Sequence, residues 1–315
     1  MTGLPRRVEA RAPATVANLG PGFDILGMAL AEPFDTVIAE RADAPGVTIA
    51  DISGDSGRLP RDPARNTAGI AAAAVLEQIG ARGTGVRLTI HKGLPLASGM
   101  GSSAASAAGA AVAVNALFGE RLARPDLIPA CLEGEAAVSG RHADNIAPAL
   151  LGGIVLITGL DASDIYALPV PDSLALVLVT PAVEVPTAQA RAVLPGAVRL
   201  PDVVRQTAGV ALLITAIHRG DVALMGRAME SDVIVEPARA HLMPGLPEVR
   251  AAACASGAHG TIISGAGPTL CALSDPTTAE RVAESVAAVY AGMGIAAQVR
   301  VTRPALGGVR ITRVD

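Results

Sequence analysis

The sequence is poor in aromatic residues and in lysine. It has no tryptophan, and aromatic residues make up 2% of its 315 residues, although half of the chain is hydrophobic. The core must therefore be built from alanine, valine, leucine and isoleucine. Lys92 is the only lysine, because the other 24 of the 25 lysine and arginine residues are arginines. Any chemistry that needs a lysine must use Lys92, and the absence of G-x-x-x-x-G-K-[ST] excludes a Walker-type NTPase.

Clustered positive charge, cysteine motifs and long apolar runs are also missing. The net charge is −4 and no basic run exceeds Arg6-Arg7, which argues against a nucleic-acid surface. The three cysteines have no CxxC spacing, which fits a reducing compartment. The N-terminal segment lacks an apolar signal region, and the longest nearly apolar runs are shorter than the roughly 20 residues that span a bilayer. We predict a soluble, cytoplasmic protein without nucleic-acid or membrane partners.

Strand and helix patterns alternate along the whole chain. In the first half we expect strands over 8–12, 34–41, 46–52, 85–91 and within 150–159, and helices over 66–79, 103–117 and 125–139. In the second half we expect strands over 175–181, 261–267, 271–274 and 296–302, and helices over 202–218, 221–231, 246–256 and 277–293. These patterns predict an α+β fold with two domains, residues 1–163 and 164–315.

The stretch GLPLASGMGSSAAS, residues 93–106, has the composition of a phosphate-binding loop. Glycine allows tight turns and lets a ligand approach the main chain. A helix that begins directly afterwards presents unpaired N–H groups and a partial positive charge to an anion. Ser98, Ser102 and Ser103 add hydroxyls for phosphate or for a hydrated Mg²⁺. The alternative is an ordinary helix cap, but the segment is longer than a cap requires.

Three segments in this order resemble the motifs of the GHMP kinases. They are APATVANLGPGFDILGMAL (12–30), GLPLASGMGSSAAS (93–106) and ISGAGPTLCAL (263–273). The resemblance implies an ATP-binding N-terminal domain like domain 2 of ribosomal protein S5 and a ferredoxin-like C-terminal domain. It also implies ATP and Mg²⁺ as cofactors.

Further segments resemble the members that phosphorylate homoserine: GRHADNIAPALLGG (140–153), TAQARAVLP (187–195) and EPARAHLMPG (236–245). They imply transfer of phosphate from ATP to the γ-hydroxyl of L-homoserine, a step of threonine biosynthesis, in a protein that is commonly a homodimer. The alternatives are another GHMP small-molecule kinase, acting on mevalonate or a sugar, and a catalytically inactive GHMP-fold binding protein.

The resemblance also implies site residues. For the substrate, Arg191 and Arg239 match the carboxylate-binding arginines, whose planar forks suit a carboxylate. The ammonium pocket and its neighbourhood correspond to Asn18, Asp24, Asp144 and Thr187. The nucleotide residues are Asn66, Lys92, Pro95, Leu96, Ala97, Ser98, Gly99, Met100, Gly101, Ser102, Ser103, Ala104 and Thr269. Glu135 matches the Mg²⁺-ligating acid, with Ser103 or Ser102 as its hydroxyl partner.

One position has consequences for the mechanism. Mevalonate-kinase-like members use an aspartate and a lysine to activate the alcohol, but Asn145 stands at the aspartate position and the first motif has no lysine. Phosphoryl transfer has a loose transition state, and positioning and charge neutralisation carry most of the catalysis. We therefore expect Asn145, Ser103 and Glu135 to be the catalytic residues, with Asn145 orienting the hydroxyl.

Overall fold

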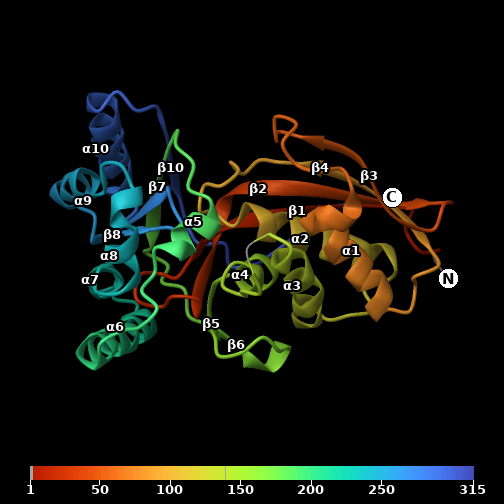
Figure 1. Ribbon diagram of the computed structural model, residues 1–315, viewed down its shortest axis with the longest axis horizontal. Helices are drawn as coiled ribbons and strands as arrows, with labels where there is room; N and C mark the ends of the chain where they lie inside the picture. Colours follow the sequence, from red (N-terminus) through yellow and green to blue (C-terminus); the bar gives the residue numbers. More distant parts are fainter. Residues whose placement is uncertain (1–2, 139) are drawn as a thin grey trace.

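The computed structural model describes residues 3–138 and 140–315, whose strands form two sheets (Figure 1). The first sheet has the order β11-β1-β2-β4-β3, and β5 joins it through β2 and continues to β6. The β3–β4 pair is parallel and the other pairs are antiparallel. Its strands are β1 (Arg7–Ala17), β2 (Leu26–Ala42), β3 (Gly46–Ser53), β4 (Gly85–His91), β5 (Ile154–Ile157), β6 (Ile165–Leu168) and β11 (Arg310–Val314).

Helices α1 to α4 cover one face of this sheet (Figure 1). Their bounds are α1 (Thr67–Gln78), α2 (Ser102–Leu117), α3 (Ile128–Ala136) and α4 (Ile146–Leu151). Helix α2 packs on β1 and β2 and is buried from Ala104 to Leu117. A Cβ on its Gly109 would lie 2.9 Å from a methyl of Val37, so the helix needs small residues to approach the sheet this closely. The alanine run and the lack of aromatic residues thus serve the same packing.

The second sheet is antiparallel, with the order β10-β7-β9-β8. Its strands are β7 (Ala175–Pro181), β8 (Gly260–Ile263), β9 (Leu270–Ser274) and β10 (Ala297–Thr302). The helices of this half are α5 (Thr187–Ala192), α6 (Leu200–Arg219), α7 (Val222–Met229), α8 (Val235–Arg239), α9 (Leu246–Ala255) and α10 (Ala279–Gly292). One hydrophobic core extends from the first sheet to one face of the second, where α6 and α7 join it, and a separate core lies beneath α9 and α10.

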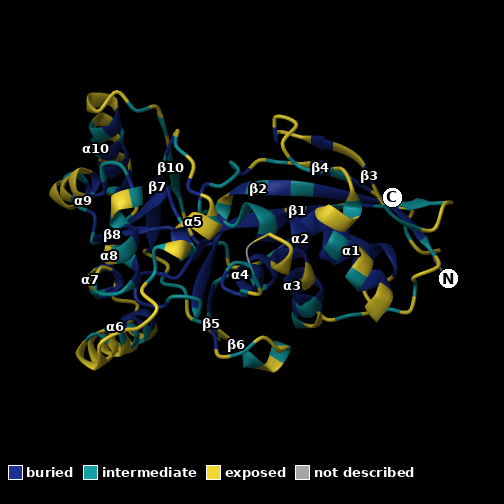
Figure 2. Cartoon of the chain, viewed as in Figure 1, coloured by how far each residue is buried: buried dark blue, intermediate teal, exposed yellow. Residues whose placement is uncertain are grey.

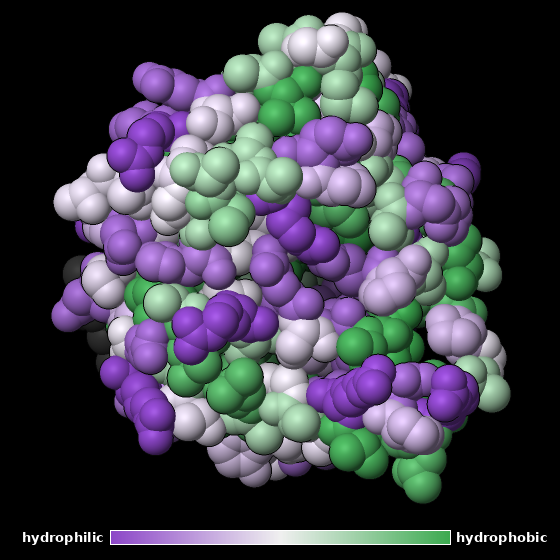
Figure 3. Space-filling view, turned by 90° about the vertical axis from the view of Figure 1, so that its left-hand side faces the viewer, coloured by the Kyte–Doolittle hydropathy of each residue, from purple (hydrophilic) through white to green (hydrophobic). Residues whose placement is uncertain are grey.

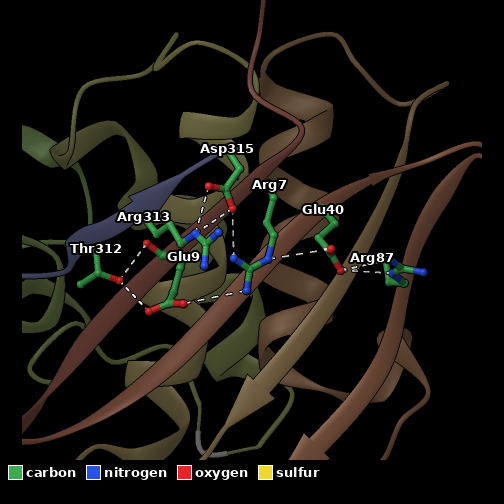
Figure 4. A network of polar contacts seen from close by, with 7 residues as sticks. All are labelled: Arg7, Glu9, Glu40, Arg87, Thr312, Arg313 and Asp315. Carbon is green, nitrogen blue, oxygen red and sulfur yellow. Dashed lines mark hydrogen bonds and ion pairs between the residues drawn. The ribbon is translucent and has the colours of Figure 1, made fainter.

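The last strand of the chain, β11, lies beside the first strand, β1. β11 pairs with β1, the N–H of Arg6 donates to the carbonyl of Asp315 at 2.8 Å, and the termini lie together (Figure 1). Arg7 contacts Asp315 at 3.3 Å within a network of charged side chains (Figure 4). These ion pairs are partly or largely exposed, and such pairs are each worth about 1 kcal/mol or less. The backbone pairing therefore does most to hold β11 in place.

The α+β prediction is confirmed, but the sheets divide the chain differently from the predicted ranges 1–163 and 164–315. Both β6 and β11 belong to the first sheet, so by sheet membership residues 165–168 and 310–314 go with the N-terminal half. The strand β2 also begins at Leu26, eight residues before the strand expected over 34–41. Of the helix expected over 125–139, residue 139 lies outside the described residues, and the remainder begins with a 3₁₀ turn, Pro125–Leu127, followed by α3. Strand β6 and helices α4, α5 and α8 are only four to six residues long, too short for a periodic pattern to stand out.

Helix α6 is the one helix in residues 3–138 and 140–315 whose length and composition would allow it to cross a membrane. Its inward side chains, among them Leu213 and Ile217, are buried, and the helix packs against α7. Its outward face is largely exposed (Figure 2), and hydrophilic and hydrophobic residues are interspersed over this end of the molecule (Figure 3). This distribution describes a peripheral helix that packs on a core.

Candidate active site

A cavity of about 410 Å³ lies between the two halves of the chain. It is lined by most of the predicted site residues: Asn18, Asp24, Asn66, Lys92, Leu96, Ala97, Ser98, Gly99, Gly101, Ser102, Ser103, Glu135, Asp144, Asn145, Thr187, Arg191 and Arg239. The remaining four predicted residues do not line it. Met100 and Ala104 are buried behind it, Pro95 faces a neighbouring cavity, and Thr269 lies inside the protein.

Thr269 contacts the phosphate loop, residues 95–104, from behind. Its N–H donates to the carbonyl of Ser98 at 3.1 Å, and its hydroxyl pairs with that of Thr180 at 2.7 Å. Ser264 of the same motif donates its hydroxyl to the carbonyl of Gly99 at 2.8 Å. The third motif therefore supports the phosphate loop in this structure, and Thr269, predicted as a nucleotide residue, does not line the cavity.

The phosphate loop, residues 95–104, is shaped by left-handed backbone conformations. Ala97, Gly99 and Gly101 have φ of 51°, 79° and 67°. A Cβ on Gly99 would overlap the carbonyl of Ser264, so only glycine permits the close approach of the third motif. Among the described residues, no side chain caps the start of α2. The first N–H groups of α2 are thus not satisfied by a cap, as an anion site at a helix start requires.

Lys92 anchors this loop. Its side chain is 1% exposed. Its ammonium forms an ion pair with the buried Asp35 and donates to the carbonyl of Ser102 and the hydroxyl of Ser106, both at 2.8 Å. Burial lowers the pKa of Lys92, and the charge of Asp35 opposes this effect. Asp35 also accepts from the N–H groups of Gly93 and Leu94 at 2.9 and 3.1 Å. The ammonium of Lys92 is therefore paired and hydrogen-bonded inside the protein, although the residue lines the cavity.

Asn66 is likewise engaged in the fold. Its side-chain oxygen caps α1 by accepting from the N–H of Ala68 at 3.0 Å, and its amide donates to the carbonyl of Pro60 at 2.9 Å. Arg58, Pro60 and Arg65 line the same end of the cavity and were not predicted. They lie in the segment before α1, which carries no recognisable motif. The only sequence signals of a site there were the arginines of this segment and its position next to Asn66.

Ser103 and Glu135 meet at the start of α2. The Ser103 hydroxyl donates to Glu135 Oε1 at 3.0 Å, and Glu135 is 5% exposed. Within the described residues, no three His, Cys, Asp or Glu side chains gather into a metal cluster of their own. Mg²⁺ commonly takes one or two carboxylates and completes its shell with phosphate oxygens and water. A carboxylate beside a hydroxyl at a phosphate loop fits such an ion.

Charged side chains gather at the opposite end of the cavity. Arg191 donates two hydrogen bonds to Asp24, at 2.8 and 3.2 Å, and both side chains are a little over one-quarter exposed. Asp24 has φ of 63° and is fixed by its N–H, which donates to Asn18 Oδ1 at 3.1 Å. His142 Nδ1 lies 3.5 Å from Oδ2 of Asp24. Asp24 is thus held in an unusual backbone conformation and faces the guanidinium of Arg191.

Arg239 enters this end from α8 and is 2% exposed. It donates to the carbonyls of Ala190 and Gly265 at 3.0 and 2.9 Å. The guanidinium carbons of Arg191 and Arg239 each lie 5.2 Å from the ring centre of Phe23. Phe23 therefore contacts both guanidinium groups. It was missed in the sequence, although its place beside Asp24 in a chain with three phenylalanines is a usable signal.

Asp144 completes this charged end, and Asn145 lies next to the start of α2. Asp144 is 4% exposed, and burial, followed by the charges of Asp24 and Glu135, raises its pKa to about 7. A bound cation would favour its charged form. Asn145 precedes α4 and accepts a hydrogen bond from the hydroxyl of Thr15 at 2.6 Å. The cavity therefore joins an anion-binding loop, a carboxylate–hydroxyl pair and a charged acceptor end.

Known proteins show the same organisation. The family models for the GHMP kinases N terminal domain and the GHMP kinases C terminal domain match residues 66–153 and 213–292. A homoserine kinase of Arabidopsis thaliana is 49% identical, over 85% of this chain and 74% of its own length. A homoserine kinase of Chlorobium phaeobacteroides is 43% identical, over 90% of this chain and 92% of its own. A crystal structure of homoserine kinase from Cytophaga hutchinsonii, 39% identical, superposes with a TM-score of 0.94 and 99% coverage of both chains. A mevalonate kinase of L. major, at 17% identity and a TM-score of 0.71, shares the fold.

Proposed function

Because the chain belongs to the homoserine kinases of the GHMP kinase family, we propose that it transfers the γ-phosphoryl group of ATP directly to the γ-hydroxyl of L-homoserine, without a dedicated catalytic base. Its two-domain α+β fold and its relatives make it an ATP-dependent small-molecule kinase. The proposal concerns how the residues of this cavity perform that reaction. We also propose that the reaction serves threonine biosynthesis in the cytoplasm.

The observation that carries the proposal is the ion pair between Arg191 and Asp24 beside Arg239 and Asp144. L-Homoserine has one carboxylate and one ammonium. When it binds, its carboxylate replaces Asp24 as the partner of Arg191, and its ammonium replaces Arg191 as the partner of Asp24. A zwitterion therefore leaves neither member of the pair without an opposite charge, which a neutral sugar or a simple carboxylate does not achieve.

The same arrangement positions the phosphate acceptor, which is the γ-hydroxyl of homoserine. The carboxylate is held by Arg191 and Arg239 and the ammonium by Asp24 and Asp144, so the short side chain of homoserine extends toward Asn145. Gly101, at the start of α2, lies against the Asn145 side chain. The hydroxyl is thereby brought next to the loop that holds the phosphates. Positioning of this kind accounts for much of the rate enhancement in phosphoryl transfer.

Mg²⁺ would be held by Ser103 and Glu135 and, when bound, would neutralise charge on the phosphates of ATP. Glu135 lies on α3 and Ser103 on α2, and the contact between these helices fixes the pair. Lys92, through the carbonyl of Ser102, holds the first turn of α2 in register with the loop. These residues bind and orient the nucleotide, and the acceptor end supplies no charge to the phosphates.

Asp144 is an alternative base, since a pKa of about 7 suits a general base near neutral pH. We assign it to the ammonium instead, because a neighbouring cation lowers the pKa of a carboxyl group and leaves it a weak base. The two roles differ in kinetics. As an ammonium ligand, Asp144→Asn raises the KM for homoserine, whereas loss of a base lowers kcat at little-changed KM.

An ADP-release assay with L-homoserine, mevalonate, galactose and no acceptor tests the reaction. We expect turnover with L-homoserine only; turnover with mevalonate or galactose identifies another GHMP kinase, and turnover with none of them identifies a binding protein. In the same assay, Asn145→Ala should lower kcat with a modest change in homoserine KM. A steep KM rise at unchanged kcat contradicts the assigned role of Asn145.

A further inference from the structure

Thr15 lies between the phosphate loop and Asn145 and is fully buried. Its N–H donates to the carbonyl of Met100 at 3.1 Å, and its hydroxyl donates to Asn145 Oδ1 at 2.6 Å. A Cβ on Gly101 would overlap the Thr15 hydroxyl and lie 2.8 Å from Asn145 Oδ1. One residue of β1 therefore touches the loop that binds the donor and the amide that we assign to the acceptor.

The pairing of β1 with β2 explains how Thr15 contacts both the phosphate loop and Asn145. The β1–β2 register is interrupted between Pro13, which pairs with Phe34, and Thr15, which pairs with Ala29. An irregularity of this kind re-aims the side chains of a strand, and it often occurs beside active sites. Beyond it, the Thr15 N–H bonds the loop carbonyl of Met100.

We propose that Thr15 is a positioning residue, which fixes Asn145 in the orientation that presents its N–H₂ group to the substrate and sets its place relative to the phosphate loop. This inference rests on the proposed function. Because Asn145 Oδ1 already accepts from Thr15, the amide nitrogen is the part of the side chain that serves the substrate. An amide nitrogen donates hydrogen bonds and does not accept a proton.

The chemical consequence is specific. The amide N–H of Asn145 bonds one lone pair of the homoserine hydroxyl, which aims the other at the γ-phosphorus. The new bond forms between this oxygen and phosphorus while the bond to the β,γ-bridging oxygen breaks, and ADP leaves with that electron pair. The hydroxyl proton passes to an oxygen of the transferred phosphoryl group or to water. Thr15 thereby makes Asn145 a hydrogen-bond donor in a transfer that has no base.

Thr15→Val removes the hydroxyl while keeping nearly the same shape. We expect kcat to fall about tenfold, the factor that corresponds to losing one well-aligned hydrogen bond, with the KM values for ATP and homoserine changed less than about twofold. Thr15→Ser keeps the hydroxyl and should retain most of the activity. Thr261→Val is the matched control, because Thr261 is 1% exposed but lies in β8, outside the cavity.

The double variant Thr15→Val/Asn145→Ala gives the decisive measurement. If Thr15 acts through Asn145, Thr15→Val causes little further loss of kcat once Asn145 is alanine. Losses that multiply in the double variant overturn the proposal. It is also overturned if Thr15→Val keeps full kcat while Asn145→Ala loses it, a result that leaves the proposed function intact. If Asn145→Ala itself keeps full kcat, the proposed role of Asn145 is wrong.

A spectroscopic signal separates positioning from a general loss of stability. The side-chain ¹⁵N–¹H₂ resonances of Asn145, assigned by their disappearance in Asn145→Ala, should shift in Thr15→Val and stay in place in Thr15→Ser and Thr261→Val. Should Thr15→Val not fold, Thr15→Ala with the same resonances replaces it. Unchanged Asn145 resonances in a folded variant that lacks the hydroxyl contradict the proposal.

Discussion

The donor end and the acceptor end of the cavity are built in opposite ways. The phosphate loop at the donor end, residues 95–104, is one continuous segment that offers backbone and hydroxyl groups and has no charged side chain. At the acceptor end, charged side chains come from four separate places: Asp24 follows β1, Asp144 precedes α4, Arg191 lies on α5 and Arg239 on α8. The first is a property of local backbone shape, and the second depends on how the two sheets pack together.

This difference predicts how substitutions impair each end of the cavity. The donor end relies on small residues in close contact, so an added methyl group displaces several partners at once. The acceptor end relies on opposite charges, so losing one charge weakens binding and alters selectivity while the fold survives. The predictions below test this contrast in order of decreasing effect.

Gly101→Ala should have the largest effect. Its φ of 67° is unfavourable for alanine, and the new methyl group would displace Thr15 and Asn145. We expect kcat/KM for homoserine to fall at least about 100-fold, since a displacement of about 1 Å at a reacting centre costs that much. Gly220→Ala is the control, with φ of 64° and open space around it. Equal losses in both variants mean that backbone strain, and not the contact, is responsible.

Arg239→Leu should come next and act on substrate binding. It removes a buried cation of the carboxylate clamp, and we expect the homoserine KM to rise roughly 30-fold, with the ATP KM within about twofold. Because the carbonyl of Ala190 loses its bond from Arg239 and the carbonyl of Gly265 keeps only its bond from Asn18, thermal unfolding must be measured alongside. Arg205→Leu on the exposed face of α6 is the control. An unaltered homoserine KM removes Arg239 from the clamp.

Asp24→Asn should change selectivity by roughly tenfold. In the wild type, 4-hydroxybutanoate, which has no ammonium, must break the Arg191–Asp24 pair and leave Asp24 without a cation. The neutral asparagine removes that cost, which is about 1–3 kcal/mol for an uncompensated polar group. The ratio of kcat/KM for L-homoserine to that for 4-hydroxybutanoate should therefore fall. A ratio that stays constant shows that the ion pair does not select for a zwitterion.

The titration of Asp144 should give the smallest kinetic effect. With a pKa of about 7, its charged fraction rises about threefold from pH 6.5 to pH 7.5, and kcat/KM for homoserine should rise by the same factor. Asp144→Asn should remove this rise. A pH profile that is the same in both proteins assigns the titration to another group, such as His142 beside Asp24.

The same pKa predicts a stability effect of known sign. The folded protein holds a proton on Asp144 up to about pH 7, whereas the unfolded chain releases it near pH 4. The wild type should therefore lose stability relative to Asp144→Asn as the pH rises from 4 to 7, by roughly 4 kcal/mol at most, and the difference should stay constant at higher pH. Urea unfolding of both proteins at pH 5, 6, 7 and 8 measures it.

The sequence by itself determined most of the longer strands and helices and the loop at 93–106, because each depends on short-range sterics and hydrophobic period. The sequence also identified Asn145, because the resemblance places an amide at the position where mevalonate-kinase-like members have an aspartate. Thr15 lay within the first motif, but nothing local distinguishes a side chain that serves the site from one that serves the core.

Only the tertiary structure decided which groups meet. Lys92 finds Asp35 across 57 residues, Thr15 finds Asn145 across 130, and Arg191 finds Asp24 across 167. It also returned β11 to β1 and placed β6 in the first sheet, against the predicted domain ranges. The physical reason is that such pairings follow from burial and from the packing of the two sheets, which sum contributions from the whole chain and leave no signature in any short segment.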